Sequence, residues 1–225
     1  MINNNHLSKY TTVFEAGCKI LYGPHAAAGY LLSITAEIAV RQPMHLLDFG
    51  NRCDMYYIAR QLRYLTRDPA AALQNIRLQR AFTCYQALAL LRQISGMEAG
   101  LPVVILDLLS PFLDENIKTA EIFRIYAEVT ELLRDAMQVR PVLVGVKPVP
   151  QKLAPDRVCL VSSLARSFGL IPVGNTENEA RNQLAEDKAF SGYLLRPAVQ
   201  AFGERNMSEQ TQGKPELMSG QPTLF

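Results

Sequence analysis

Short apolar runs alternate with longer stretches of helical periodicity from about residue 15 to residue 150. Such runs, with few polar residues, are typical of strands that are buried on both faces. Four of them predict buried strands, at residues 18–22, 44–49, 103–107 and 142–146. Residues 76–82 alternate apolar and polar residues and predict a further strand with one better-covered face. Because strands alternate with helices in the manner of β-α-β units, we expect an α/β fold with a mainly parallel sheet and helices on both of its faces.

The stretches between these runs place apolar residues at helical spacing. They predict helices over residues 26–40, 55–65, 85–94 and 117–138. Thr83 is a suitable N-cap for the third of them. Asp68 followed by Pro69 predicts the start of a further helix, because Asp accepts hydrogen bonds from free backbone N–H groups and proline suits the first turn.

The chain has 225 residues, of which 48% are apolar and 20% charged, and this suits one large globular domain or two small ones. We expect that domain to cover residues 1–202. Residues 203–220 contain few large apolar groups, so residues 203–225 are predicted to form a disordered tail. After the fifth strand the pattern weakens, with candidate helices at 158–168 and 175–188 and a last apolar segment at 193–202.

Charge and cysteine content narrow the function classes. The net charge is only +2, from 23 Lys and Arg against 21 Asp and Glu, so any contact with nucleic acid must be local. No run approaches the roughly 18 apolar residues of a membrane span, and the polar start is unlike a signal peptide, so we expect a cytoplasmic protein. The four cysteines are dispersed without the spacing of a zinc site, so no metal is expected.

Two stretches carry a resemblance to a known family. Residues 65–91 contain Asp68-Pro69, Asn75-Ile76 and Arg80-Ala81-Phe82-Thr83, and residues 103–107 are four apolar residues followed by Asp107. Together with the helix and strand that end at Gly145, they resemble the core of RecA/RadA-like recombinases and their paralogues. The resemblance covers about residues 15–150 and implies a RecA-like P-loop core.

A working nucleotide site of that family needs the motif G-x-x-x-x-G-K-[ST], in which backbone N–H groups and Lys bind phosphates and the hydroxyl binds magnesium. Here the loop from Gly23 to Gly29 is one residue longer than the motif requires. Tyr30 stands at the position of the Lys, and Leu31 stands at the position of the Ser or Thr. Neither the phosphates nor the metal would find its usual partner.

The resemblance also implies positions for two carboxylates. In recombinases of the RadA type, the acid that activates water lies two residues after the Asp of the next strand. The matching position here holds Gly50, after Asp48. Asp107 matches the carboxylate that contacts the magnesium shell, although a buried, hydrogen-bonded Asp at a strand end is the role that we favour. We therefore expect a pseudo-ATPase without a cofactor, and weak ATP binding stays open.

In the recombinases, the loops after the fourth and fifth core strands face DNA. The first of these loops is acidic here, at residues 110–115, and would repel phosphate. The second carries Lys147, Lys152 and Arg157 among prolines. These three residues are candidate DNA contacts, and an ordinary solvated loop is the alternative.

The last five residues read Q-P-T-L-F, with Gln221, Leu224 and Phe225 in a Q-x-x-L-F pattern. This pattern resembles the peptide by which bacterial replication and repair proteins bind the β sliding clamp. The resemblance implies that Leu224 and Phe225 enter an apolar pocket while Gln221 hydrogen-bonds beside it. A disordered stretch at residues 203–220 would give the peptide a reach of about 20–25 Å. The alternative is that Leu224 and Phe225 fold back onto the protein's own surface.

These expectations combine into a non-catalytic RecA-like accessory protein of DNA repair, recombination or translesion synthesis, associated with the nucleoid and recruited to the sliding clamp. It would resemble ImuA-type accessory proteins, with a translesion polymerase or a recombinase as a further partner. Two alternatives stay open: an active RecA-like or KaiC-like ATPase with an unorthodox phosphate loop, and a structural recombinase-paralogue subunit in which the tail is irrelevant.

Overall fold

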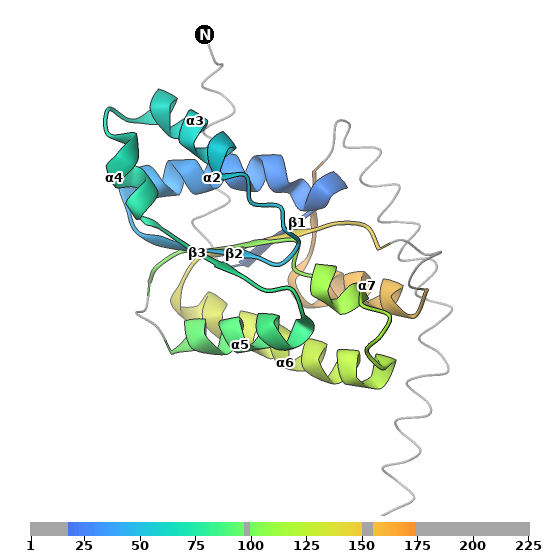
Figure 1. Ribbon diagram of the computed structural model, residues 1–225. Helices are drawn as coiled ribbons and strands as arrows, with labels where there is room; N and C mark the ends of the chain where they lie inside the picture. Colours follow the sequence, from blue (N-terminus) through green and yellow to red (C-terminus); the bar gives the residue numbers. More distant parts are fainter. Residues whose placement is uncertain (1–17, 97–99, 150–154, 174–225) are drawn as a thin grey trace, which may run out of the picture.

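The computed structural model describes residues 18–96, 100–149 and 155–173. A six-stranded sheet, in which all neighbouring strands run parallel, lies at its centre (Figure 1). The strands are β1 (Cys18–Tyr22), β2 (Met44–Asp48), β3 (Ile76–Arg80), β4 (Val103–Leu106), β5 (Val142–Val146) and β6 (Ile171–Pro172). Their order in the sheet is β3-β2-β4-β5-β1-β6. The predicted α/β fold with a parallel sheet is confirmed.

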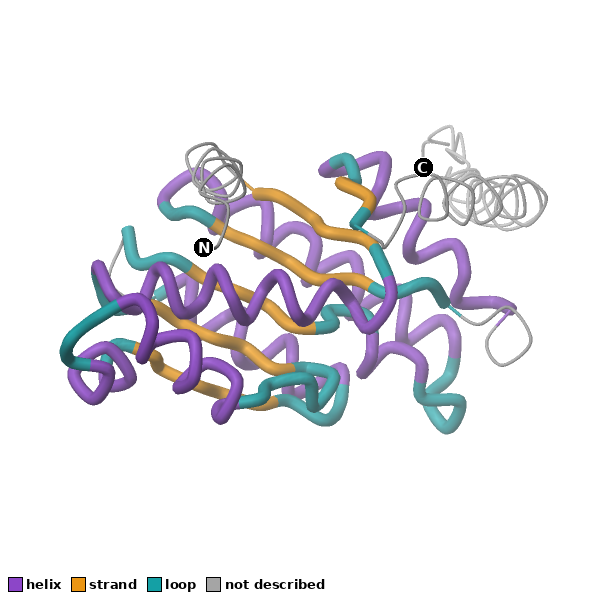
Figure 2. Tube along the Cα trace, turned by 90° about the horizontal axis from the view of Figure 1, so that it is seen from above, coloured by secondary structure: helices purple, strands orange, loops and turns teal. Residues whose placement is uncertain are grey.

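Two layers of helices cover the sheet, one on each face (Figures 1 and 2). The first layer contains α2 (Ala28–Arg41), α3 (Met55–Leu65) and α4 (Pro69–Gln74). The second contains α5 (Cys84–Ser95), α6 (Thr119–Val139) and α7 (Val158–Phe168). Short 3-10 turns lie in the connections: η1 (Pro24–Ala27), η2 (Ser110–Leu113) and η3 (Pro155–Arg157).

Alternate residues of the central strands pack into two apolar layers, one on each face of the sheet. Leu46 of β2 is in register with Val104 of β4, and both pack toward α2, α3 and α4. Leu47 and Ile105, the next pair in register, pack toward α5 and α6 on the opposite face. All four side chains are fully buried, and each such side chain stabilises the fold by about 1.5–3 kcal/mol. Burial on both faces explains why β4 and β5 are continuous runs without polar side chains.

The starts of two helices have the caps that the sequence predicted. The Asp68 carboxylate accepts a hydrogen bond from the backbone N–H of Ala71 at 3.0 Å, at the start of α4. The Thr83 hydroxyl accepts one from the N–H of Gln86 at 3.2 Å, at the start of α5. Each cap satisfies a donor that the helix itself leaves free.

The last part of the sheet was not predicted. β6 is only two residues long and pairs with β1, and Val173 just after it donates its N–H to the carbonyl of Tyr22 at 2.7 Å. The candidate helix at residues 158–168 is confirmed as α7. The segments at 175–188 and 193–202 lie outside the described residues.

Candidate functional site

The carboxyl ends of the strands form the edge of the sheet at which the candidate site lies. From this edge the chain continues from β1 and β2 into α2 and α3 on one face, and from β4 and β5 into α6 and α7 on the other (Figure 1). β3 also leads to this second face, into α5. Because β2 neighbours both β3 and β4, and β1 neighbours β5, adjacent strands lead to opposite faces at three places. In parallel α/β sheets, ligands bind in the crevices at such places.

The loop at the phosphate-loop position follows β1 and adopts left-handed backbone conformations. Three of its residues have φ values between 52° and 56°: His25, Ala26 and Ala27. This region costs a residue other than glycine roughly 1–2 kcal/mol. A right-handed helix cannot contain these residues, so α2 begins at Ala28 and the predicted start at residue 26 is wrong.

Close contacts pack this loop onto the sheet. Gly23 donates its N–H to the carbonyl of Val146 at 3.1 Å. The carbonyl of Ala26 lies so close to Gly145 of β5 that a Cβ at that glycine would overlap it. A Cβ at Gly23 would likewise overlap the carbonyl of Val173. The loop therefore depends on glycine at both of these positions.

Gly29, Tyr30 and Leu31 lie together at the start of α2. Nothing lies within 4 Å of the place that a Cβ would take at Gly29. The Tyr30 side chain is 41% exposed, whereas Leu31 is fully buried against Gly145. The residue at the position of the phosphate-binding Lys thus reaches the surface, and the residue at the position of the magnesium-binding hydroxyl is part of the core.

Asp107, immediately after β4, is completely buried and has a φ of 55°. Its Oδ2 atom accepts a hydrogen bond from Lys147 Nζ at 2.9 Å and one from Arg52 Nε at 3.3 Å. Its Oδ1 atom is also buried and makes no hydrogen bond within the described residues. The carboxylate at the predicted magnesium position is therefore neutralised by two cations of the protein itself, and a single acceptor atom remains for a ligand.

Gly50 lies directly against Asp107. An ideal Cβ at Gly50 would overlap Cβ of Asp107 and lie 2.5 Å from its Oδ2. Real Cβ atoms essentially never approach another heavy atom below 3.0 Å. The position at which the resemblance places the water-activating acid has no room for any side chain unless Asp107 moves.

A second buried carboxylate, Asp48, lies at the end of β2. Its Oδ1 accepts a hydrogen bond from the N–H of Arg52 at 2.8 Å, and its Oδ2 accepts one from the N–H of Cys53 at 3.1 Å. Arg80, at the end of β3, places its Nε 3.3 Å from Oδ2. Burial, and then the charge of Asp48, raise the pKa of the Cys53 thiol to about 11, so Cys53 stays a thiol at neutral pH.

The ends of β2, β3, β4 and β5 thus carry one charged network. It contains two carboxylates and three cations: Asp48, Asp107, Arg52, Arg80 and Lys147. Each carboxylate is paired with at least one of these cations through its Oδ2. Sequence reasoning missed Arg52, Arg80 and Cys53. Their positions could have indicated these residues, since each of them ends or closely follows a predicted strand.

The three candidate DNA contacts have different surroundings. Lys147 turns toward Asp107, and its side chain is only 22% exposed. Lys152 lies outside the described residues. The Arg157 guanidinium is buried and donates to the carbonyls of Phe112, at 2.7 Å, and Ile117, at 2.9 Å. Two of the three residues thus bind partners within the protein.

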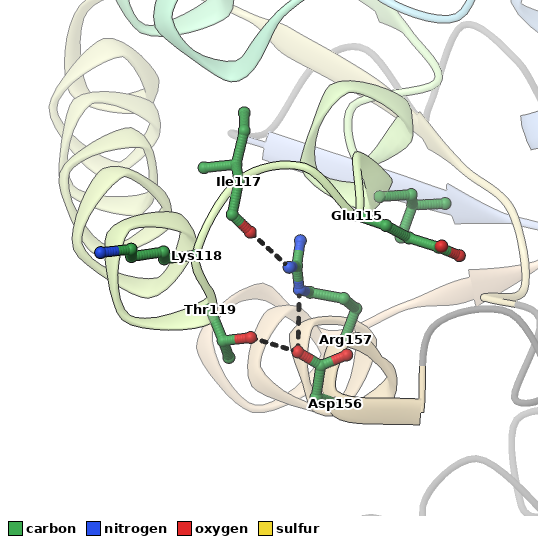
Figure 3. A pocket seen from close by; sticks show the side chains of 7 residues that line it. Glu115, Ile117, Lys118, Thr119, Asp156 and Arg157 are labelled. Carbon is green, nitrogen blue, oxygen red and sulfur yellow. Dashed lines mark hydrogen bonds and ion pairs between the residues drawn. The ribbon is translucent and has the colours of Figure 1, made fainter.

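Arg157 borders a polar cavity of about 320 Å³ between the start of α6 and the start of α7 (Figure 3). Its Nε donates to Asp156 at 3.2 Å, and Asp156 also accepts a hydrogen bond from the Thr119 hydroxyl. In the figure the guanidinium points at the chain before α6 rather than outward. These contacts join two connections of the fold, which gives Arg157 a structural role.

Gln221, Leu224 and Phe225, the predicted clamp-binding residues, lie outside the described residues. Within the described residues, no group of three or more His, Cys, Asp and Glu side chains is placed to hold a metal ion. None of the helices described is both long and apolar enough to cross a membrane. A scan against protein-family models and a search of curated proteins gave no match.

Proposed function

We propose that this chain is a non-catalytic RecA-like accessory protein of DNA repair, recombination or translesion synthesis, and that it binds the bacterial β sliding clamp through residues 221–225. The observation that carries the non-catalytic part is the environment of Asp107. Its Oδ2 accepts from Lys147 and Arg52, at 2.9 Å and 3.3 Å, so a metal at this oxygen would have to displace the protein's own cations. Only Oδ1 makes no hydrogen bond within the described residues.

Two further features support the absence of phosphoryl transfer, which relies on positioned charges. Leu31 contributes an apolar side chain to the core where the family has a magnesium-binding hydroxyl. Gly50 lies too close to Asp107 to be replaced by an acid. A protein that lacks these groups works through what it binds, and the Q-x-x-L-F sequence supplies a ligand for the clamp.

Two measurements test this proposal. Calorimetric titration of purified β clamp should show binding to the full chain and at least tenfold weaker binding to the Leu224→Ala/Phe225→Ala variant. Thr223→Ala, at a variable position of the same motif, should bind like the wild type. Equal affinity of the wild type and the double variant would contradict the role of the peptide.

The second measurement is ATP turnover. We expect turnover at the background level for the wild type, with or without DNA. Turnover well above background that disappears in Asp107→Asn, while Arg92→Gln on the distant helix α5 retains it, would instead favour the ATPase alternative.

A further inference from the structure

The outer side of α3 combines exposed aromatic and basic side chains, and α3 lies on the outside of its helix layer (Figure 1). Its inner side is held by the buried residues Ile58 and Leu62. Four exposed residues share the opposite side: Tyr56, Arg60, Arg63 and Tyr64. At 100° per residue these four positions fall within about 100° of the helix circumference, so they form one stripe.

The arginines of this stripe differ from those of the other helix layer. Within the described residues, neither Arg60 nor Arg63 pairs with a carboxylate, and residues 55–67 contain no Asp or Glu. On α5 and α6, by contrast, each of three exposed arginines pairs with a glutamate: Arg92 with Glu128, Arg124 with Glu121 and Arg134 with Glu131. The positive charge of α3 is therefore available to an external anion.

The tyrosines of the stripe are unusually exposed. Tyr56 is 92% exposed and Tyr64 is 76% exposed, whereas their neighbour Tyr57 is partly buried and hydrogen-bonded to Ser33 at 2.8 Å. Exposed aromatic rings keep a large apolar face in water. Arg60 lies over the ring of Tyr57, with 5.5 Å to its centroid, and this contact leaves its charge without a carboxylate partner. Two exposed rings beside two such arginines supply both of the groups that proteins use to bind single strands of nucleic acid: stacking platforms for bases and cations for phosphates.

We propose that the outer stripe of α3 binds single-stranded nucleic acid, with Arg60 and Arg63 on phosphates and Tyr56 and Tyr64 stacked on bases. The two tyrosines are eight residues apart, or about 12 Å along the helix. This distance corresponds to roughly three to four nucleotides at a stacked spacing of about 3.4 Å. The site is separate from the loops that the family resemblance implied and does not depend on the clamp peptide.

The tyrosines favour a single strand over the other polyanions. A DNA duplex keeps its bases stacked on each other, so it would contact the arginines and leave the tyrosines without a partner. An acidic protein segment would also pair with the arginines alone. A contribution of the tyrosines to binding therefore separates the proposed ligand from both alternatives.

Fluorescence anisotropy with labelled oligo-dT of about 20 nucleotides tests the proposal on the full chain. The Tyr56→Ala/Tyr64→Ala variant should bind at least about tenfold more weakly with an unchanged salt dependence. The Arg60→Gln/Arg63→Gln variant should also bind more weakly. Each phosphate contact contributes about 0.7 to the slope of log affinity against log salt, so the loss of two contacts should reduce the magnitude of that slope by about 1.4.

Matched controls are available away from α3. Phe82→Ala removes an exposed aromatic ring, and Arg124→Gln removes an exposed arginine on α6, and neither should alter binding. The proposal is overturned if wild-type protein does not bind oligo-dT, or if the tyrosine variant binds it as tightly as the wild type. Equal affinity for a duplex of the same length, or binding only to polyglutamate, would likewise overturn it in favour of the other polyanions.

Discussion

Lys147 and Asp107 form an ion pair with 2.9 Å between Nζ and Oδ2, although forty residues separate them in the sequence. The pair joins the end of β5 to the end of β4. A lysine that was a candidate for binding DNA thus has a partner inside the protein. The buried Asp107 carboxylate thus has a cation of the protein itself beside it.

Breaking this pair should destabilise the fold. Lys147→Met leaves the fully buried Asp107 carboxylate with Arg52 alone, and we expect a loss of about 2–3 kcal/mol in the free energy of unfolding, measured with urea. Arg92→Gln, which removes an exposed ion pair, should cost less than about 1 kcal/mol. The single variants Asp107→Asn and Lys147→Met are compared with the double variant. If the double variant loses as much free energy of unfolding as the two single variants together, the two residues are uncoupled and this interpretation is wrong.

Gly50 and Gly29 should respond to alanine in opposite directions. Gly50→Ala places a methyl group against Asp107 and should cost about 2–3 kcal/mol through overpacking. Gly29→Ala adds a methyl group in open space on α2 and should stabilise the protein by about 0.5–1 kcal/mol. Thermal unfolding of both variants checks this. A midpoint of Gly50→Ala equal to that of the wild type would mean that Asp107 moves aside without cost.

The strands and most helices of this fold could be predicted because their signals are local. A parallel strand covered on both faces, such as β4, must be apolar at every position, and the caps at Asp68 and Thr83 act within three residues of sequence. β6 was missed because two residues carry no periodicity, and its placement depends on the hydrogen bond between Val173 and Tyr22.

The candidate site could be predicted only in part. The replacements at Tyr30 and Leu31 are visible in the sequence, because the motif that they interrupt is contiguous. The contact between Arg52 and Asp107 spans 55 residues, and it exists only because β2 and β4 are neighbours in the sheet. No local pattern in the sequence indicates which cation pairs with which carboxylate.

The buried guanidinium of Arg157 should contribute to stability and not to DNA binding. Arg157→Gln removes charged donors from the carbonyls of Phe112 and Ile117, and we expect a loss of about 2–4 kcal/mol in urea unfolding. Hydrogen exchange should become faster in residues 112–117. Arg166→Gln, an exposed change on α7, serves as the control. A variant with wild-type stability and weakened DNA binding would restore Arg157 as a DNA contact.

His45 should make the stability of the protein depend on pH. Its side chain is buried on β2, and both ring nitrogens lack a hydrogen-bond partner within the described residues. Burial first, and then the charges of Arg77 and Arg140, lower the pKa of His45 below its usual value. Between this lowered pKa and the unfolded value near 6.5, the unfolded chain binds more protons than the folded one, so the free energy of unfolding must fall as the pH falls.

Urea unfolding of wild-type protein between about pH 7.5 and pH 5.5 should therefore show decreasing stability on acidification. His45→Leu places an apolar side chain at this buried position and should lose this part of the pH dependence. His25→Gln changes an exposed histidine and should keep it. Carboxylates titrate mainly below this range and affect all three proteins alike. An equal slope in the wild type and His45→Leu would show that another group is responsible.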